Sequence, residues 1–468
     1  MGVKMENNLL DFLILHGVFI VGEILIVITL IHMLYQRRTP TSMISWLLFM
    51  IILPYISVVL YFLIGTRKQP TKNDKSALEI KSSGGESAIE VNSIDGILRS
   101  NGIVGVSEHN SFELITDSVK AYETLMDAIQ KAEKSISMST YVFKNDAVTQ
   151  QIIAAMTERA SQGVHVRLLI DSLGSYTLYF FQDPLKKLRQ AGCEVHFFMP
   201  LLRLPYQNYI NLRNHRKIYL FDENILLSGG MNLSNEYMGP VKRDDQWEDL
   251  LFKTEGEATY QYAQIFEDDW SYATDKPLRY ATVPHKEHYG DAYIQVVPSG
   301  PDIKGDALLE ALISAIYTAK KRIWIVTPYF VPDECLTHAL KIARHKGVDV
   351  KLITPKVSNH IIADLSRSSY MRELAENNID LVLYNGNMLH AKAILFDDSA
   401  AMIGSVNIDN RSLLLNYEVV SFAYSKTIIS EIERWMQGFI SNAETRMPRA
   451  SNMRRIAENF MRILAPQL

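Results

Sequence analysis

The sequence predicts an α/β fold in which two pseudo-symmetric α/β sandwich domains share one active site and follow an N-terminal two-helix transmembrane hairpin. Three observations indicate this fold. Two long apolar segments open the chain, helical and strand patterns alternate from about residue 111 onward, and the same order of segments occurs twice. The predicted parts are a hairpin at 1–68, a linker at 69–110, domains at 111–300 and 301–446, and an amphipathic helix at 447–468.

The hairpin is predicted from two apolar segments, 12–34 and 43–64. Each is long enough to cross the hydrocarbon core, which takes roughly 20 residues. Pro54 falls inside the second segment, and membrane helices tolerate proline. A signal peptide followed by one anchor is the alternative, but no small-residue cleavage site follows the first segment. We therefore expect a multi-pass protein of the cell membrane with two membrane helices.

Basic residues beside the apolar segments predict the orientation of the hairpin. Arg37 and Arg38 lie in the short loop between the two segments. The larger basic group follows the second segment and consists of Arg67, Lys68, Lys72 and Lys75. Because cytoplasmic flanks of membrane helices carry the excess of Lys and Arg, we expect the catalytic body in the cytoplasm.

The composition argues against several classes of protein. Lys and Arg number 48 against 52 Asp and Glu, a formal net charge of -4, and no basic groove with interleaved aromatic residues is evident, so nucleic acid is not an expected partner. Cys193 and Cys335 lack the spacing of a metal site or a disulfide framework. The sequence shows no Asp/Glu cluster or HExxH motif that would require a metal, so we predict none. The oligomeric state is not predicted.

An internal repeat organises the rest of the chain. The segment AYETLMDAIQKAEKSISMSTYVF (121–143) has its counterpart in DALLEALISAIYTAKKRIWIVTPYF (306–330). GVHVRLLID (163–171) is matched by GVDVKLITP (347–355). A duplicated α/β unit accounts for both pairs at once.

The repeat also contains the chemistry. NHRKIYLFD (214–222) corresponds to LHAKAILFD (389–397), so each copy holds the spacing His-x-Lys-x4-Asp. Side chains alternate across a strand, and His215 therefore shares a face with Lys217, as His390 does with Lys392. Two copies with the same internal spacing, unlike one His-x-Lys alone, are not expected by chance.

Each copy continues to a carboxamide, Asn232 in GGMN and Asn407 in GSVN. Imidazole, ammonium and carboxamide groups together suit a phosphate. Phosphoryl transfer through a covalent intermediate needs one neutral imidazole to attack phosphorus and another to protonate the departing oxygen, and two facing halves would supply both. Asp222 and Asp397 complete the motifs but lie out of phase with the His-Lys pairs, which favours an architectural role.

The chain resembles the phospholipase D superfamily with two HKD motifs, and within it most closely the bacterial cardiolipin synthases. The resemblance covers nearly the whole chain: the two-helix N-terminus, the His-x-Lys segments, TPYFVPDE (327–334), GSVNIDNRS (404–412) and NYE (416–418). It implies two phospholipase D-like domains. It also implies transfer of a phosphatidyl group from one phosphatidylglycerol to another through a phosphohistidine, with release of glycerol, formation of cardiolipin and no cofactor.

The resemblance also implies roles for individual residues. His215 would be the nucleophile and His390 the general acid and then base, although the chain alone does not order them. Asp249 and Glu418, at comparable distances downstream of the two motifs, would orient the imidazoles. The predicted catalytic set is His215, Lys217, Asp222, His390, Lys392 and Asp397, and Asn232 and Asn407 are predicted to bind phosphate.

Some positions depart from the synthase pattern. WEDLL (247–251) stands where WRDTH is usual, and Asn359 stands where an aspartate is typical. These departures put the headgroup preference in doubt. Two other functions stay open: a phospholipase D-type hydrolase, in which water intercepts the phosphohistidine, and an inactive membrane-binding protein. The second would predict erosion of a motif, yet both motifs are intact.

Two further features allow two interpretations each. Tyr329 and Phe330 either flank the site entrance or fill the core. In the C-terminal segment 452–464, apolar residues recur at helical spacing beside three arginines, so the helix either docks on the body or contacts anionic lipid. The apolar residues are Met453, Ile456, Phe460, Ile463 and Leu464, and the arginines are Arg454, Arg455 and Arg462.

Overall fold

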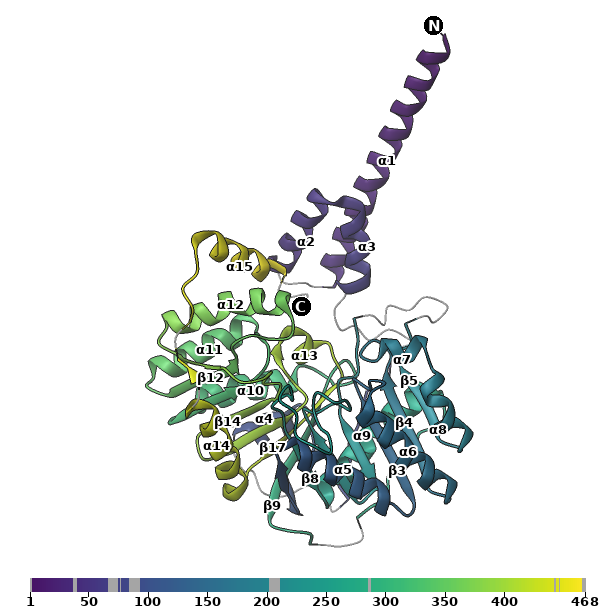
Figure 1. The fold of residues 1–468 in the computed structure, drawn as a ribbon. Coiled ribbons are helices and arrows are strands. Elements are labelled where there is room, and N and C mark those ends of the chain that lie inside the picture. The colour runs from purple at the N-terminus through teal and green to yellow at the C-terminus, as the bar shows by residue number, and fades with distance from the viewer. Residues whose placement is uncertain are drawn as a thin grey trace. The chain divides into compact units, whose positions relative to one another are not determined.

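The computed structural model describes residues 2–36, 40–65, 75, 77–83, 93–201, 211–284, 288–441, 443–445 and 447–464. The chain forms two compact units, Met1–Thr71 and Lys72–Pro466, and each is described by itself (Figure 1).

The N-terminal unit contains α1 (Gly2–Tyr35), α2 (Pro40–Ile52) and α3 (Pro54–Ile64). Among the described residues one helical stretch, His16–Tyr35, is long and apolar enough to cross a membrane. The second predicted helix is divided at Leu53, because Pro54 has no backbone N–H and its ring clashes with the preceding turn. One continuous second span is therefore not confirmed. The flanking charges Arg37, Arg38, Arg67, Lys68 and Lys72 lie outside the described residues.

The three helices pack on one another through a small apolar cluster that includes Met33, Trp46 and Tyr61. The Tyr61 hydroxyl lies 2.8 Å from Nδ1 of His32, which gives a polar partner to the imidazole in this helical unit.

The second unit contains two mixed β-sheets. The seven-stranded sheet has the order β2-β8-β7-β6-β3-β4-β5, and the nine-stranded sheet has the order β1-β9-β17-β15-β14-β10-β12-β13-β18. The order β8-β7-β6-β3-β4-β5 recurs as β17-β15-β14-β10-β12-β13, with the same parallel and antiparallel pairings. The repeat read from the sequence is therefore a repeat of topology.

The elements before and within the first half are α4 (Ser93–Ser100), β1 (Ser107–Asn110), β2 (Glu113–Ile115), α5 (Ser118–Lys131), β3 (Ser135–Thr140), α6 (Ala147–Ser161), β4 (His165–Asp171), α7 (Tyr176–Phe180), α8 (Lys186–Gln190), β5 (Glu194–Phe198), β6 (Ile218–Phe221), β7 (Ile225–Gly229), β8 (Leu251–Thr254) and α9 (Glu257–Thr274).

The elements of the second half are β9 (Ala292–Ser299), α10 (Ala307–Thr318), β10 (Arg322–Val326), β11 (Phe330–Val331), α11 (Glu334–His345), β12 (Asp349–Pro355), α12 (Ile361–Glu376), β13 (Asp380–Tyr384), β14 (Ala393–Phe396), β15 (Ala400–Gly404), β16 (Ile408–Asp409), α13 (Asn410–Leu414), β17 (Glu418–Ala423), α14 (Lys426–Ser441), β18 (Ala443–Glu444) and α15 (Asn452–Leu464).

β1, from the predicted linker, and β9, from the predicted first domain, both belong to the second sheet. β9 pairs with β17 as β2 pairs with β8, so β9 is the second-half counterpart of β2. The domain limits at 111–300 and 301–446 stay a prediction, and the sheet pairing favours a boundary ahead of Ala292.

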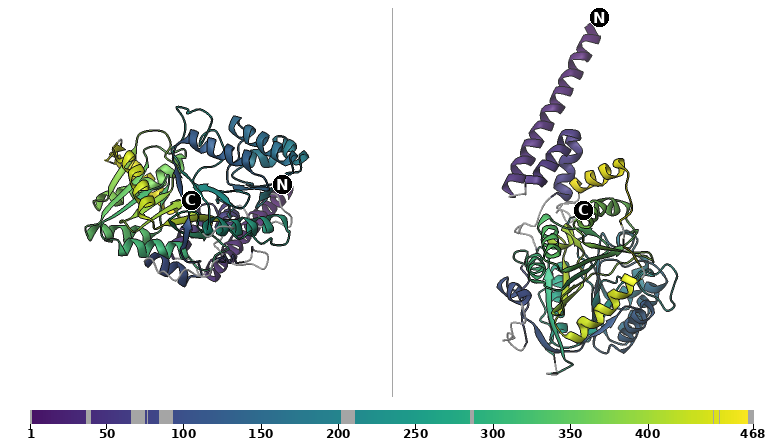
Figure 2. Two further views of the ribbon diagram at one scale, coloured as in Figure 1. Left: turned by 90° about the horizontal axis from the view of Figure 1, so that it is seen from below. Right: turned by 90° about the vertical axis from the view of Figure 1, so that its left-hand side faces the viewer.

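The two sheets are layered between helices (Figures 1 and 2). Helices α5, α6 and α8 cover the outer face of the first sheet, and α10, α11 and α12 cover the outer face of the second. A third apolar cluster joins the halves and contains side chains from both, among them Leu220 of β6 and Leu395 of β14. Burying this shared core holds the two halves as one body.

Candidate active site

The backbone at each His-x-Lys segment is bound to the opposite half. The N–H of His215 donates to the carbonyl of Tyr417 at 2.8 Å, and the N–H of His390 donates to the carbonyl of Glu248 at 2.7 Å. Each histidine therefore stands just ahead of its strand, β6 or β14, where the two halves meet.

Both histidines line one open cavity of about 550 Å³. Asn232 and Trp247 contribute to its wall from the first half, and Asn407 contributes from the second. The structure thus brings both imidazoles and both carboxamides of the repeated segment to a single pocket.

The buried carboxylates pair with the imidazoles in a crossed arrangement. Nδ1 of His215 lies 2.9 Å from Oε2 of Glu418, and Nδ1 of His390 lies 2.7 Å from Oδ2 of Asp249. Each half therefore supplies the carboxylate for the other half's histidine. Because a carboxylate fixes the imidazole tautomer with the proton on Nδ1, Nε2 is the nitrogen left for chemistry. The sequence predicted both carboxylates but not which imidazole each one serves.

The pocket favours neutral imidazoles. Burial, and then the charge of Lys392, lower the pKa of His390 to about 3 against the opposing effect of Asp249. Burial also lowers the pKa of His215, with Glu418 opposing and Lys217 adding to the effect. A neutral imidazole has a free lone pair on Nε2, which is the state that a nucleophile needs.

The two lysines are buried beside the histidines. Nζ of Lys217 donates to the carbonyl of His215 at 2.8 Å, and Nζ of Lys392 lies 2.7 Å from Nδ1 and 3.2 Å from Nε2 of His390. Burial lowers the pKa of Lys217 to about 7 and that of Lys392 to about 8, and the charge of Lys392 adds to the effect on Lys217.

These lysine pKa values predict a pH dependence of substrate binding. As pH rises from about 6 to about 9, the empty pocket loses positive charge, since a lowered pKa means deprotonation at a lower pH. KM for an anionic phosphodiester lipid should therefore rise about tenfold or more, as expected for loss of a charge-assisted contact. Initial rates in lipid–detergent micelles across this range measure it, and a KM that is flat to pH 9 would contradict the prediction.

The two asparagines differ in their partners. Oδ1 of Asn232 accepts from the N–H of Val142 at 3.1 Å, and its Nδ2 donates to the Tyr237 hydroxyl at 2.9 Å. Nδ2 of Asn407 has only a 3.4 Å contact with Ser412, and its Oδ1 has no hydrogen-bond partner among the described residues. Asn407 therefore keeps the greater capacity to bind a ligand.

Asp222 and Asp397 lie outside the pocket, at the far ends of β6 and β14, roughly 20 Å along the strand from the histidines. Asp222 accepts the backbone N–H groups of residues 133–135, and Asp397 accepts those of residues 320–322. Both have positive φ, 52° and 51°. The geometry supports their predicted architectural role and places them too far away to touch a substrate bound at the histidines.

Asp397→Ala should lower stability and leave the chemistry intact. The substitution removes the acceptor for three N–H groups and places alanine at a positive φ, so the free energy of unfolding should fall by roughly 1–3 kcal/mol. Urea unfolding measures this, with Asp397→Asn as the milder control because asparagine tolerates this conformation. A loss of kcat beyond about threefold in the folded variant would indicate that Asp397 takes part in catalysis.

Aromatic rings flank both imidazoles. The Tyr141 ring lies 4.9 Å from that of His215, and the Trp247 and Tyr237 rings lie 5.4 and 5.2 Å from that of His390. Tyr329 lines the pocket and donates to Asn359 at 2.6 Å, whereas Phe330 is core. Sequence reasoning missed Tyr141 and Tyr237. For Tyr141 a signal existed, since the repeated strand ends in an aromatic pair in both halves.

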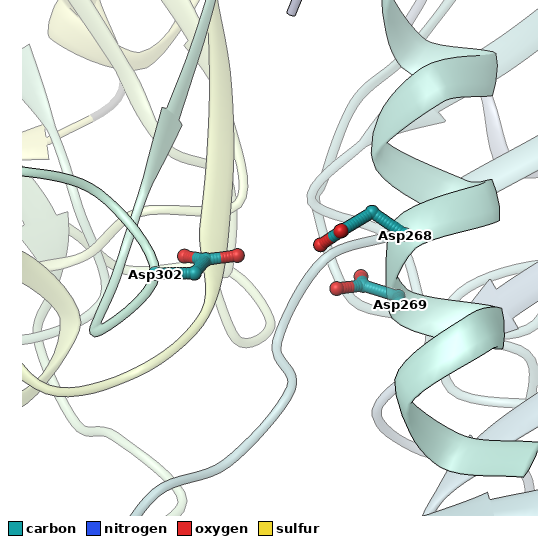
Figure 3. A group of neighbouring side chains, drawn as sticks. All are labelled: Asp268, Asp269 and Asp302. Carbon is teal, nitrogen blue, oxygen red and sulfur yellow. The ribbon is translucent and has the colours of Figure 1, made fainter. Parts of the chain in front are cut away.

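Behind His215 lies a buried ion network that the sequence did not predict. Asp268 and Asp269 project from α9, and Asp302 approaches them from the turn after β9 (Figure 3). Nζ of Lys75 contacts all three carboxylates, and the Arg216 guanidinium lies 2.7 Å from Asp269 and 3.0 Å from Asp302. Two cations of the chain thus occupy the space that a metal ion would take, and we assign the group to ion pairing.

Lys75 is therefore not the flanking charge that the sequence suggested. It is 7% exposed, because its ammonium is drawn into the acidic cluster. Burial alone would lower the pKa of Lys75, but the charges of Asp269 and Asp302 outweigh it and raise that pKa above its ordinary value. The Arg216 side chain, on the face opposite to His215 and Lys217, also donates to the carbonyl of Glu418 at 3.1 Å.

Lys75→Met should destabilise the body strongly. It leaves the buried Asp269 and Asp302 and the partly buried Asp268 with one cation, so the free energy of unfolding should fall by roughly 3–5 kcal/mol. Lys81→Met is the matched control, since Lys81 is an exposed lysine of the same segment and its replacement should change stability by at most about 0.5 kcal/mol. Chemical denaturation of both full-length variants measures the difference. Equal free energies of unfolding for the two variants would contradict a large contribution of the ion network to stability.

Comparison with known proteins agrees with this architecture. Residues 125–270 and 312–440 match the family described as "Cardiolipin synthase, PLD-like domain", and residues 24–65 match "Phospholipase_D-nuclease N-terminal". The chain is 31% identical over 461 residues to cardiolipin synthase 1 of Bacillus cereus, covering 92% of this chain and 90% of the relative. It is 34% identical over 457 residues to a cardiolipin synthase of Geobacillus, with 92% and 90% covered.

A solved structure shares the fold. The phosphatidylserine synthase of Haemophilus influenzae Rd KW20 superposes with a TM-score of 0.61 at 15% identity, covering 80% of this chain and 98% of the other. This likeness shows the shared fold. The family match over both halves defines the class: a phospholipase D-like protein. More narrowly, the chain belongs to the cardiolipin synthase family.

Proposed function

We propose that the protein is a cardiolipin synthase that transfers a phosphatidyl group from one phosphatidylglycerol to another and releases glycerol. The observation that carries the proposal is the pair of imidazoles, one from each half, which line one pocket while Nδ1 of each contacts a buried carboxylate. Such a pair supplies the nucleophile and the proton donor that a phosphohistidine route requires.

The route has two steps. Nε2 of His215 attacks phosphorus and a P–N bond forms. The P–O bond to glycerol breaks as His390, which carries a proton on both ring nitrogens once the anionic substrate is bound, gives its Nε2 proton to the departing oxygen and becomes neutral. His390 then removes the proton from a hydroxyl of a second phosphatidylglycerol, whose oxygen attacks phosphorus while the P–N bond breaks. The order of the histidines follows the family resemblance. The products are cardiolipin and free glycerol, with no change of oxidation state.

Charge in the pocket fits this route. The bound phosphodiester is an anion, and it offsets the lysine charge that helps to hold the imidazole pKa low, so binding raises the pKa of His390 toward the value that a proton donor needs. Lys217, Lys392 and the two carboxamides Asn232 and Asn407 would hold the phosphate oxygens. We assign the orienting roles to Asp249 and Glu418, and we expect no metal or cofactor to be required.

The membrane arrangement is part of the proposal. α1 would form one span, and α2 and α3, which together cover residues 40–64, would form a second span kinked at Pro54. We place the catalytic body in the cytoplasm. Labelling of single introduced cysteines with a membrane-impermeant reagent in intact and opened cells tests this, and a body labelled in intact cells would contradict it.

The decisive experiment gives the purified protein in lipid–detergent micelles phosphatidylglycerol labelled in its glycerol headgroup and its acyl chains, in the presence of a chelator. Cardiolipin and labelled glycerol in equal amounts are expected. Phosphatidic acid as the sole lipid product would instead assign a hydrolase, and a requirement for a CDP-activated donor would overturn the symmetric exchange. His390→Ala protein is the control for contaminating activity.

A further inference from the structure

Helix α15 presents its apolar face away from the body. Glu458 of α15 is 1% exposed and pairs with Arg372 of α12 at 2.7 Å. Asn459 of α15 accepts a hydrogen bond from the hydroxyl of Ser369, also in α12, at 2.8 Å. The polar face of an amphipathic helix is therefore the face that contacts protein, which reverses the usual arrangement.

Three apolar side chains of α15 remain uncovered in this structure. Met453, Ile456 and Phe460 are 76%, 62% and 57% exposed, and their spacing places them on one face, opposite to Glu458. The side chains of Ile463 and Leu464 lie outside the described residues. A face of this kind calls for an apolar partner.

Two more exposed apolar sites lie close in the chain to residues that line the pocket. On the second half, Ile361 is 80% exposed at the start of α12, directly between pocket-lining residues His360 and Ile362. On the first half, Phe181 is 75% exposed at the end of α7, which begins two residues after the pocket-lining Gly174. In Figure 1, α7, α12 and α15 lie toward the same end of the body.

The occupant of these surfaces follows from the substrate chemistry, and this step rests on the proposed function. A phospholipid whose phosphate lies between the histidines must pass its two acyl chains out through the pocket mouth, and the chains are unfavourable in water. The bilayer is where acyl chains already are. Arg454 and Arg455 on α15 keep their side chains about half exposed, which suits a surface with anionic headgroups.

We propose that Phe181, Ile361 and the α15 face of Met453, Ile456 and Phe460 form a lipid-docking rim that inserts into the bilayer interface and opens the pocket mouth to the headgroup layer. The rim acts separately from the N-terminal helices, since it orients the body on the membrane. Those helices only tether it.

Fluorescence tests insertion without relying on activity. The full-length Phe460→Trp variant is placed in vesicles of phosphatidylcholine and phosphatidylglycerol, with the unmodified protein as background. Lipids brominated near the start of their acyl chains should quench the added emission at least twofold. Tyr280→Trp is the matched control, since Tyr280 is 84% exposed and is absent from the pocket lining, and it should show no quenching. No quenching of the Phe460→Trp emission, or burial of that site in a dimer of this chain, overturns the rim.

Enzyme kinetics test whether the lipid-docking rim gives the active site access to lipids in a bilayer. Met453→Ser/Ile456→Ser/Phe460→Ser should lose about tenfold in kcat/KM on phosphatidylglycerol in bilayers and keep the unmodified rate on short-chain phosphatidylglycerol dissolved as monomers. The control Leu278→Ser/Tyr280→Ser/Val283→Ser removes three other exposed apolar side chains and should leave both rates unchanged. An equal loss on both substrates would overturn the docking role. Absence of activity in the unmodified protein would instead refute the proposed function, while the fluorescence result would still stand.

Discussion

His215→Ala and His390→Ala should each reduce cardiolipin formation by about 10⁴-fold or more. Each imidazole is a single group at a distinct place in one pocket, and no other described histidine except His360 lines that pocket. Losing either the nucleophile or the proton donor removes a whole step rather than one contact. Initial rates on phosphatidylglycerol measure the loss. His165→Ala, which alters a half-exposed histidine paired with Glu194, is the control and should retain full activity.

An activated substrate separates the two roles. When the leaving group is p-nitrophenol, its low pKa removes the need for a proton donor, so His390→Ala should still release one equivalent and accumulate the phosphohistidine. His215→Ala should release none. The reverse pattern would exchange the two roles, and near-normal turnover by either variant on phosphatidylglycerol would remove that histidine from the chemistry.

Asp249→Asn and Glu418→Gln should each lower kcat by about 10²–10⁴-fold with little change in KM. The neutral amide can no longer fix the Nδ1–H tautomer or stabilise a charged imidazole, as measured effects at histidine–carboxylate pairs indicate. Both carboxylates are buried, so water cannot substitute for them. Single-turnover kinetics measure the effect, and an unchanged circular dichroism spectrum shows that each variant is still folded.

The crossed pairing predicts which variant the activated substrate rescues. Asp249 contacts His390, so Asp249→Asn should recover most of its first-step rate with p-nitrophenol as leaving group. Glu418 contacts His215, so Glu418→Gln should stay slow. Rescue of Glu418→Gln instead would mean that each carboxylate serves the histidine of its own half.

The repeat was readable from the sequence because its features are local. Strand alternation puts His215 and Lys217 on one face whatever the rest of the chain does. The same rule placed Asp222 on the opposite face from His215 and Lys217. This agrees with the structure, in which Asp222 accepts hydrogen bonds from the backbone N–H groups of Lys134 and Ser135.

Features that depend on contacts between distant segments were not readable. The carboxylates Asp269 and Asp302 meet only because α9 and the turn after β9 pack together, and Lys75 joins them from a segment that reads as a solvated linker. A sequence periodicity likewise reveals that α15 is amphipathic but not which face it turns toward the body. The division of the second apolar segment at Pro54 had a local signal, but proline is compatible with both a kinked span and a break.

The exchange of carboxylates between halves makes the two lobes mutually dependent. A lobe produced alone would hold a histidine without its partner acid and an acid without its histidine, and it could rebuild a working centre only by associating with a complementary lobe. Joining both lobes in one polypeptide fixes their ratio at one to one. An inactivating substitution in either lobe therefore disables the whole active site, and neither lobe can diverge toward a separate function.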